Sequence, residues 1–389
     1  MHNNHINNLL DLKGVIVKNI VSKPSFIEIH IQTKVKTHKC PACGSLTKRV
    51  HDYRYQRIKD IPIQSKNTFL VLRKRRYLCL CGKRFYEKLD FLPRYHRMTN
   101  RLSAYIINEL KSNYSVTSIA NRLNISTHTV NRVFDHIQYF NNTLPEVLSI
   151  DEFKGNSGGA KYHCILVDPK SKRVLDILKD RKIYVLTSYF KQFKDRSNVK
   201  YFITDMWRPY VDIAKTYFKN ALIVIDKFHF IRHNIWAIEG VRKRIQKSMP
   251  ANLRRYYKRS KKLVLAKYDS LDEESKKQLE IMLLYNDELR QAHYLKEHFY
   301  EFTQAKSSKE AKVLLRRWIE MALRSEIKEY VSCAKTYSIW FNEICNSFDV
   351  PYTNGCTEGF NNKIKVIKRN AYGFRNFDRF RNRILHCCN

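Results

Sequence analysis

The feature that most constrains the fold is a pair of aspartates set in otherwise apolar, strand-like segments. Asp151 lies inside "VLSIDEF", residues 147–153, and Asp205 closes "VKYFITD", residues 199–205. A carboxylate in an apolar strand loses its hydration, which is costly unless a cation or a hydrogen-bond donor compensates. A bound metal is the economical compensation, so these segments predict strands that carry a metal site.

The segments around these aspartates predict a mixed sheet flanked by helices. Three successive strand-like runs joined by short turns are typical of a meander, and strands and helices alternate after it. The runs are 147–153, 161–168, 173–180, a helix-like 184–195, the strand ending at Asp205, a helix over 207–218, a strand over 221–226 and a helix from about Phe228. Ribonuclease-H-like folds place metal carboxylates on neighbouring central strands of such a sheet, so we expect that architecture. Glu152 points to the opposite face from Asp151 and is not expected to share the metals.

A further acid and a histidine follow the next strand. Asp226 closes "VID", and His229 comes three residues later. The pair could support the metal ligands indirectly or act as accessory catalytic residues. Equally, Asp226 could be a helix cap and His229 a structural histidine.

The charge of the chain indicates a polyanionic partner. Seventy-three Lys and Arg face 36 Asp and Glu, and the net charge of +37 is spread over most of the chain. Nucleic acid explains this excess better than solubility alone or a membrane surface, because no amphipathic anchor accompanies the charge. The apolar runs fall far short of the ~20 residues that span a bilayer, and the start shows no secretory signal. We therefore expect a cytoplasmic protein without disulfides.

Four of the ten cysteines have metal-ligand spacing. "CPACG" contributes Cys40 and Cys43, and "CLCGKRF" contributes Cys79 and Cys81. Four thiolates suit one structural Zn²⁺, and the strand-like runs around them predict a small β-rich domain over 1–97. The second pair is CxC rather than CxxC, so His38 or His51 could replace one sulfur. The alternative is a set of unconnected buried cysteines.

A helix-turn-helix is predicted over 98–145. In "SVTSIANRLNISTHTVNRVFD" the apolar residues fall on one face of each helix, and small Ala120 permits a close crossing. Ser126 suits the N-cap of the second helix. The side chains left to reach base edges in a major groove are Thr127, His128, Asn131 and Arg132. The alternative is a helical hairpin without a DNA-binding role.

Residues 233–345 predict a helical insertion that divides the sheet domain into 146–232 and 346–389. Its stretch "VRKRIQKSMPANLRRYYKRSKKL" holds ten basic residues and no acid, so local ion-pair partners are missing. We therefore expect one side of the insertion to face DNA phosphates. The predicted contacts are Arg242, Arg244, Lys247, Arg254, Arg255, Lys258 and Arg259.

The helix predicted after residue 354 carries one acid, Glu358, ahead of a basic run. On a helical wheel Glu358 shares a face with Asn362, Lys365 and Arg369, and Lys368 adds another cation. The apolar residues of this helix lie nearly opposite. If that apolar stripe packed flat on the sheet, Glu358 would point away from the two aspartates, so the helix must cross obliquely or pack on the insertion instead.

Taken together, the segments "SIDEF", "CILVDPKSKRVLDILKDR", "ITDMWRPY", "IVIDKFHFIRH" and "TNGCTEGFNNKIKVIKRNAYGFRNFDRFRNRIL" resemble the ISL-three family of bacterial insertion-sequence transposases. The resemblance covers roughly residues 36–385, with the cysteine knuckles and the helix-turn-helix. It implies a DDE transposase in which Asp151, Asp205 and Glu358 bind two Mg²⁺ or Mn²⁺ ions. It also implies that Asp226 and His229 match the acid-and-histidine motif of related DDE enzymes. The CxC knuckle departs from the more usual CxxC.

The function predicted from the residues and the resemblance is transposition. The chain would bind the terminal inverted repeats of its element, cleave DNA at the ends by metal-dependent hydrolysis, and join the freed 3′-hydroxyl to target DNA by transesterification. By analogy we expect a homodimer associated with the bacterial nucleoid. Two alternatives remain, a catalytically silent transposase-derived regulator that binds DNA and a ribonuclease-H-like nuclease without strand transfer. Inverted repeats flanking the coding sequence would distinguish the three.

Overall fold

The computed structural model of the chain describes Leu10 and residues 12–389. The first residues, from which the sequence predicts the absence of a secretory signal, lie largely outside this described part. The chain forms two compact units. One comprises residues up to 139 together with 365–387, and the other comprises 140–364 with the last two residues.

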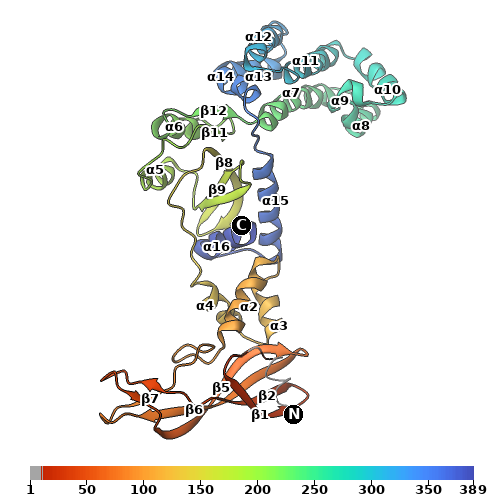
Figure 1. Cartoon of the computed structure of the whole chain (residues 1–389). Coiled ribbons are helices and arrows are strands. Elements are labelled where there is room, and N and C mark those ends of the chain that lie inside the picture. Colours follow the sequence, from red (N-terminus) through yellow and green to blue (C-terminus); the bar gives the residue numbers. More distant parts are fainter. Residues whose placement is uncertain (1–9, 11) are drawn as a thin grey trace. The chain divides into compact units, whose positions relative to one another are not determined.

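The first unit begins with a five-stranded sheet, coloured red to orange in Figure 1. Its strands are β1 (Val15–Ser22), β2 (Phe26–Thr33), β5 (Val50–Ile63), β6 (Lys66–Leu78) and β7 (Arg84–Tyr86), in the order β1-β2-β6-β5 with β7 on β6. The alternation in "FIEIHIQT" buries Ile27, Ile29 and Ile31, as a half-buried strand should. A separate pair, β3 (His38–Lys39) and β4 (Leu46–Thr47), carries the first cysteine knuckle.

β5 and β6 form a long antiparallel ribbon. Gln64 and Ser65 join them, and both adopt positive φ values, 53° and 60°. Such a two-residue turn matches the twist of the paired strands. β2 borders β6 only as far as Leu72, so the far part of the ribbon extends beyond the main sheet and meets only the short β7.

The helix-turn-helix forms as predicted. Its helices are α2 (Asn100–Lys111), α3 (Val116–Leu123) and α4 (Thr127–Phe134). Ser126 accepts a hydrogen bond from the Thr129 amide at 3.1 Å and so caps α4. The predicted interior residues are buried, including Ile119, Ala120 and Val130.

The last helix, α16 (Phe377–Cys388), completes the first unit by packing on the helix-turn-helix. Phe380, Ile384 and Leu385 are buried on it. Arg383 donates to the Ser112 carbonyl at 2.9 Å and to the Tyr114 carbonyl. The turn after α2 is therefore held by a residue almost 270 positions further along the chain.

The second unit contains the mixed sheet that the sequence predicts. Its strands are β8 (Val147–Ser157), β9 (Ala160–Asp168), β10 (Arg173–Leu178), β11 (Tyr201–Thr204) and β12 (Leu222–Ile225). Their order is β10-β9-β8-β11-β12, with an antiparallel meander followed by parallel β8, β11 and β12. β8 is therefore the central strand, and β11 is its neighbour. Two helices, α5 (Ile183–Lys191) and α6 (Arg208–Tyr217), belong to the intervening connections.

The stretch predicted as a helical insertion is helical, and no described residue between 226 and 350 belongs to a strand. Its helices are α7 (Lys227–Lys247), α8 (Ala251–Arg259), α9 (Lys261–Leu265), α10 (Glu273–Leu284), α11 (Asp287–Thr303), α12 (Ser308–Arg324), α13 (Lys328–Ile339) and α14 (Phe341–Cys345). An aromatic core that includes Phe299, Trp318 and Tyr337 holds α11, α12 and α13 together. After it, α15 (Gly355–Asn370) returns to the sheet. Of the helices described, none combines the length and apolar character needed to cross a membrane.

Candidate active site and DNA-binding elements

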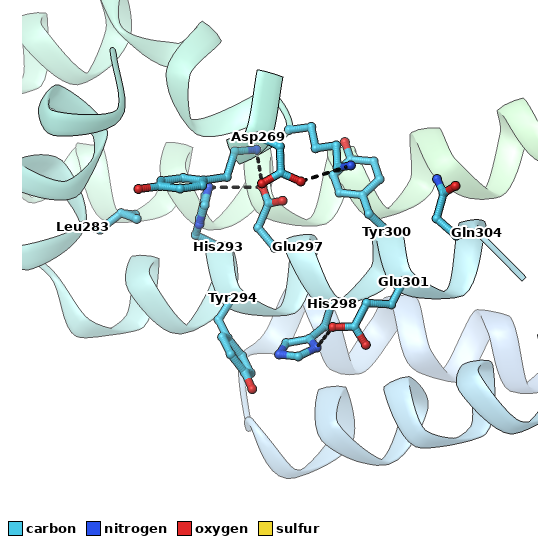
Figure 2. Close-up of a pocket in the computed structure, with 11 residues that line it drawn as sticks. Asp269, Leu283, His293, Tyr294, Glu297, His298, Tyr300, Glu301 and Gln304 are labelled. Carbon is cyan, nitrogen blue, oxygen red and sulfur yellow. Dashed lines mark hydrogen bonds and ion pairs between the residues drawn. The ribbon is translucent and has the colours of Figure 1, made fainter. Parts of the chain in front are cut away.

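A cavity of about 470 Å³ lies in the helical insertion, against α11 and the segment around Tyr268 (Figure 2). Figure 2 shows His293 and Glu297 pointing toward each other, with 3.5 Å between Nε2 and the carboxylate. Burial, followed by the nearby charge of Lys296, lowers the pKa of His293 to about 3. Lys296 itself is buried and donates to Glu297 at 2.7 Å. These three polar side chains therefore pair with one another within the insertion.

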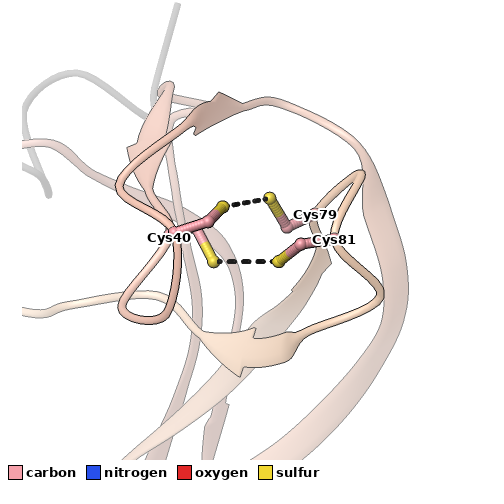
Figure 3. Close-up of side chains that lie close together, drawn as sticks. Cys40, Cys79 and Cys81 are labelled. Atoms are coloured by element: carbon pink, nitrogen blue, oxygen red, sulfur yellow. Dashed lines mark hydrogen bonds between the residues drawn. The ribbon is translucent and has the colours of Figure 1, made fainter.

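The four predicted cysteine ligands come together in the first unit (Figure 3). Their sulfur atoms all lie within 4.8 Å of one another, with Cys40 and Cys81 3.7 Å apart and Cys43 and Cys79 3.5 Å apart. Tetrahedral Zn²⁺ with bonds of about 2.3 Å requires sulfurs about 3.8 Å apart, so the cluster fits a structural zinc. The CxC pair therefore supplies both of its sulfurs.

Neither histidine alternative is needed at this cluster. The His38 ring packs against Tyr77 in a tilted arrangement with 4.5 Å between ring centres, and His51 bonds Asp52 at 3.0 Å. The two sulfurs of the CxC motif can reach one metal because the chain turns tightly after it. Gly82 adopts a φ of +80°, and the Gly82 amide donates to the Cys79 carbonyl at 2.9 Å. This turn brings Cys81 back toward the knuckle of Cys40 and Cys43.

The two predicted aspartates emerge from adjacent strands of the second unit. β8 and β11 pair in parallel with Ile203 opposite Ser149. Continuing that register by two residues aligns Asp205 with Asp151, so the two carboxylates leave the sheet at the same level. The sequence predicted neighbouring strands, and the parallel pairing places the two side chains at one site.

Both carboxylates sit in a poorly hydrated, negatively charged environment. Burial raises the pKa of Asp151 to about 6, and the neighbouring charge of Asp205 adds to the effect. Burial also raises the pKa of Asp205. The positive charge of a protonated His229 opposes both shifts. Concentrated negative charge of this kind is relieved by a cation.

An amide from α15 completes this side of the site. Asn361 donates its Nδ2 hydrogen to Asp151 Oδ2 at 3.0 Å, and the Glu152 amide donates to the other oxygen of Asp151 at 2.7 Å. Asn361 Oδ1 is buried and has no hydrogen-bond partner among the described residues. A buried amide oxygen without a donor, beside two carboxylates, is a donor set that suits Mg²⁺ or Mn²⁺.

α15 meets the sheet through a polar face. Ser149 on β8 bonds Asn354 and Thr357, the latter at 3.1 Å, and Ile364 continues the buried row. The sequence suggested that an apolar stripe of this helix would pack on the sheet and turn Glu358 away from the aspartates. Instead, small polar residues before Ile364 contact the sheet at the level of the aspartates.

Glu358 lies beside this row and is exposed. It stands about 60° around the helix from Asn361, on the flank of the contact rather than opposite to it. Within the described part of the chain, only the four cysteines gather three or more ligand atoms within 4.8 Å. The structure brings Asp151, Asp205 and Asn361 together, whereas the exposed carboxylate of Glu358 does not join them within shared-ligand distance.

Asp226 forms hydrogen bonds at the amino ends of both α7 and α15. It is buried, caps α7 by accepting from the Phe228 amide at 3.2 Å, and accepts from the Asn354 amide at 2.9 Å. His229, half-buried on the first turn of α7, is close enough for its charge to act on both catalytic candidates. Asp226 thus positions the start of α15, whereas His229 faces the aspartates.

The DNA-binding candidates fall into exposed and internally paired groups. On α4, Thr127, His128 and Arg132 are exposed and Asn131 is half-buried. In the insertion, Lys247, Arg254, Arg255, Lys258 and Arg259 are exposed. On α15, Asn362, Lys365 and Arg369 are exposed, and Lys368 is half-buried.

Two of the predicted contacts in the insertion have partners within the chain. Arg242 is buried and donates to the Tyr257 carbonyl at 3.3 Å. Arg244 binds Glu288 at 2.6 Å and Glu329 at 2.8 Å. The acids absent from the basic stretch are therefore supplied by α11 and α13.

Comparison with known proteins gives matches along most of the chain. Family models match residues 36–81 as a zinc finger of transposases IS204, IS1001, IS1096 and IS1165, 87–138 as the helix-turn-helix domain of transposase family ISL3, and 148–384 as an ISL3 transposase domain.

Two curated proteins are similar to the chain. The transposase for insertion sequence element IS1001 of Bordetella parapertussis is 28% identical over 367 residues, which cover 91% of this chain and 89% of that protein. A protein named ATP-dependent protease from Lactococcus lactis subsp. lactis is 45% identical over 56 residues, 14% of this chain and 18% of that protein, too short a match to bear on function. The ordered zinc-finger, helix-turn-helix and transposase matches, with the four-cysteine cluster, show that the chain belongs to the ISL3 family of insertion-sequence transposases.

Proposed function

We propose that the chain is a DDE transposase whose second unit is a ribonuclease-H-like domain interrupted by the helical insertion. The observation that carries this proposal is the proximity of Asp151, on β8, and Asp205, directly after the adjacent β11, beside the unpartnered oxygen of Asn361. In such a domain the third carboxylate comes from the late helix, here Glu358 on α15. Divalent ions held by the three carboxylates would supply Lewis-acid stabilisation of the attacking and leaving oxygens.

The proposed reaction has two phosphoryl-transfer steps. Water attacks the phosphodiester at the element end, the P–O3′ bond breaks, and a 3′-hydroxyl is released. That hydroxyl then attacks a target phosphodiester, and the target's own 3′-oxygen leaves as a hydroxyl. The number of phosphodiester bonds is conserved in the second step, so it requires no external energy source.

The protein's own residues orient the site for this chemistry. Asn361 fixes one oxygen of Asp151, and the Glu152 amide fixes the other, so the carboxylate is held in one orientation. Asp226 anchors the amino end of α15, which carries both Asn361 and Glu358. His229 places a titratable group beside the two aspartates and could move a proton there.

The proposed division of labour follows the domains predicted from the sequence, which are 1–97, 98–145, 146–232 with 346–389, and 233–345, except that residues 365–387 belong to the compact unit of the helix-turn-helix. The zinc-binding and helix-turn-helix elements would recognise the terminal repeats. The exposed cations of α8 and α15 would hold DNA phosphates. Paired DNA ends require two active sites, so we infer a homodimer as the working form.

The test is cleavage and strand transfer on a labelled duplex that carries the element's terminal repeat, with added Mg²⁺. We expect the wild-type chain to nick the end and join it to target DNA. Asp151→Asn should abolish both steps and leave end binding within about twofold, because the change removes charge and little volume.

Thermal unfolding provides the folding control for this variant. Removing a buried, crowded negative charge should raise the melting temperature of metal-free Asp151→Asn by about 2–4 °C. Retained strand transfer by this variant would contradict the assignment. Loss of activity together with a lowered melting temperature would point to misfolding instead.

The same assay separates the alternative functions. A silent regulator would bind the end and produce no cleavage under any metal condition. A nuclease without strand transfer would cleave the end and leave the target unjoined. The ordered recognition elements and the insertion favour transposition over both.

A further inference from the structure

The far part of the β5–β6 ribbon, within the zinc-binding element, carries a concentration of charge whose residues have no assigned role. It lies beyond Leu72, where β2 no longer borders β6, and consists of residues 52–55 and 73–76 with β7 beside them. We call this segment the distal ribbon. It belongs to the same compact unit as the helix-turn-helix.

One face of the distal ribbon gathers three cations around one tyrosine. Arg54 and Lys74 are directly opposite each other across the strands, and Arg76 is opposite Tyr86. The charged groups of the three lie 5.9, 5.4 and 5.9 Å from the centre of the Tyr86 ring. The ring therefore gathers the three cations into one patch of the ribbon.

On the other face one exposed cation lies beside two tyrosines, and the next cation, Arg75, is buried. Arg73 pairs with Tyr55 across the strands and stacks at 3.8 Å on the ring of Tyr53. Tyr55 is 70% exposed and Tyr53 is 42% exposed. Aromatic rings at this exposure on both faces of a strand pair are not required by the core of the sheet.

Like charges directly opposite each other destabilise a strand pair. Asp52, the acid on the same face, reaches Arg76 at 3.4 Å and is shared with His51 at 3.0 Å. Arg54 and Lys74 remain adjacent, although Lys74 also donates to the Gln56 side chain at 3.3 Å, and the opposed like charges cost free energy in the unbound protein. A polyanion bound at this face would remove that cost.

We propose that the distal ribbon is a second duplex-DNA contact surface, in which Arg54, Lys74, Arg76 and Arg73 hold backbone phosphates. A two-stranded ribbon fits the major groove of a duplex, where phosphates border both sides. Cations on both faces suit that position better than they suit a flat membrane surface. The proposal rests on the proposed DNA-processing function, and it adds a contact separate from the recognition helix α4.

The test compares two triple variants of the full chain, each of which loses three positive charges. Arg54→Gln/Lys74→Gln/Arg76→Gln changes the distal ribbon. Lys13→Gln/Lys18→Gln/Lys23→Gln changes exposed lysines just before, on and just after β1, in the same unit. Binding to a terminal-repeat duplex and to an unrelated duplex of equal length is measured by fluorescence anisotropy over a range of salt concentrations, without added Mg²⁺.

We expect the ribbon variant to bind both duplexes more weakly by a similar factor. Its slope of log affinity against log salt should become shallower by about 2–3, because each lost phosphate contact contributes about 0.9. The lysine control should retain a slope within about 1 of the wild-type value. Zinc content and melting temperature establish that both variants are folded.

Substitutions of Tyr86 and Asp52 test whether the arrangement of the cations, and not only their charge, determines binding. Tyr86→Phe keeps the ring and should bind as the wild type does, whereas Tyr86→Ala should weaken binding because the three cations lose their shared support. Asp52→Asn should tighten binding, which a merely structural role would not produce. An unchanged salt slope in the ribbon variant, or an equal loss in the lysine control, would overturn the proposal.

These outcomes are independent of catalysis, because no step requires cleavage. A chain that binds through the ribbon and fails to cleave would refute the proposed enzymatic function alone. A chain that cleaves normally with an unchanged ribbon variant would refute the ribbon contact alone.

Discussion

At the scale of single residues, close contacts within β8 and β9 determine how rigidly the strand that carries Asp151 is held. An added Cβ at Gly155 would lie 1.8 Å from the ring of His163. That ring cannot turn aside freely, since Ser157 Oγ bonds one nitrogen at 2.9 Å and the Lys179 carbonyl accepts from the other at 2.7 Å. The absence of a side chain at Gly155 therefore allows the two strands to pair around a buried histidine.

We predict that Gly155→Ala destabilises the second unit. Forcing a methyl group into this space should cost about 1–3 kcal/mol, measured by thermal or denaturant unfolding. Gly359→Ala is the matched control, since an added Cβ there meets nothing within 4 Å and the position is helical. That change should stabilise the chain by about 0.5–1 kcal/mol. Equal effects from the two substitutions would show that the histidine contact is not the cause.

At the scale of secondary-structure elements, α16 supports the recognition helices from the far end of the sequence. Arg383 is buried and reaches two carbonyl oxygens at the turn between α2 and α3. On the same helix, Arg379 makes an exposed ion pair with Asp135, the residue after α4, at 2.7 Å. The two arginines thus contact the same motif at very different burial.

We predict that Arg383→Met loosens the helix-turn-helix. The two carbonyls lose a donor in a buried setting, which should cost about 1–3 kcal/mol. Hydrogen exchange should rise in α2 and α3, and binding to the terminal repeat should weaken. Arg379→Gln is the control, because an exposed ion pair contributes only about 0–1 kcal/mol. Exchange that rises equally in both variants would argue against a special role for the buried arginine.

At the scale of the whole molecule, the chain divides its tasks between two units that fold around different cores. The cysteine cluster belongs to the first unit, whereas the paired aspartates belong to the second. Cys79 and Cys81 lie in the connection between β6 and β7, so a metal at the cluster would also fix the position of β7 in the distal ribbon.

We predict that removing zinc unfolds only part of the molecule. After a zinc-selective chelator, or in Cys40→Ser, hydrogen exchange should rise over residues 36–86 and stay unchanged in β8 and β11. Binding to duplex DNA should fall and return when Zn²⁺ is added back to the wild-type chain. A simultaneous rise in both units would contradict this separation, and an unchanged zinc content in Cys40→Ser would contradict the ligand assignment.

Local sequence patterns predict structural features correctly where the interacting residues are close along the chain. Ser126 as a helix cap, the alternation in β2 and the strands before Asp205 all depend on residues within a few positions, and the structure confirms them. The four cysteines were also predictable, because each pair is local and the preference of zinc for four thiolates links the pairs.

The elements, the charge and the ligand types follow from local properties of the sequence, namely periodicity, capping and metal preference. Which distant groups meet depends on how the elements pack. The sequence predicts that Arg244 contacts DNA, but in the structure it pairs with Glu288 and Glu329 from other helices. Asn361 belongs to the site because α15 packs on Ser149, a contact between residues far apart in the chain. The distal ribbon likewise emerged only once the register brought Arg54 opposite Lys74. These contacts depend on long-range packing, which no local spacing in the chain specifies.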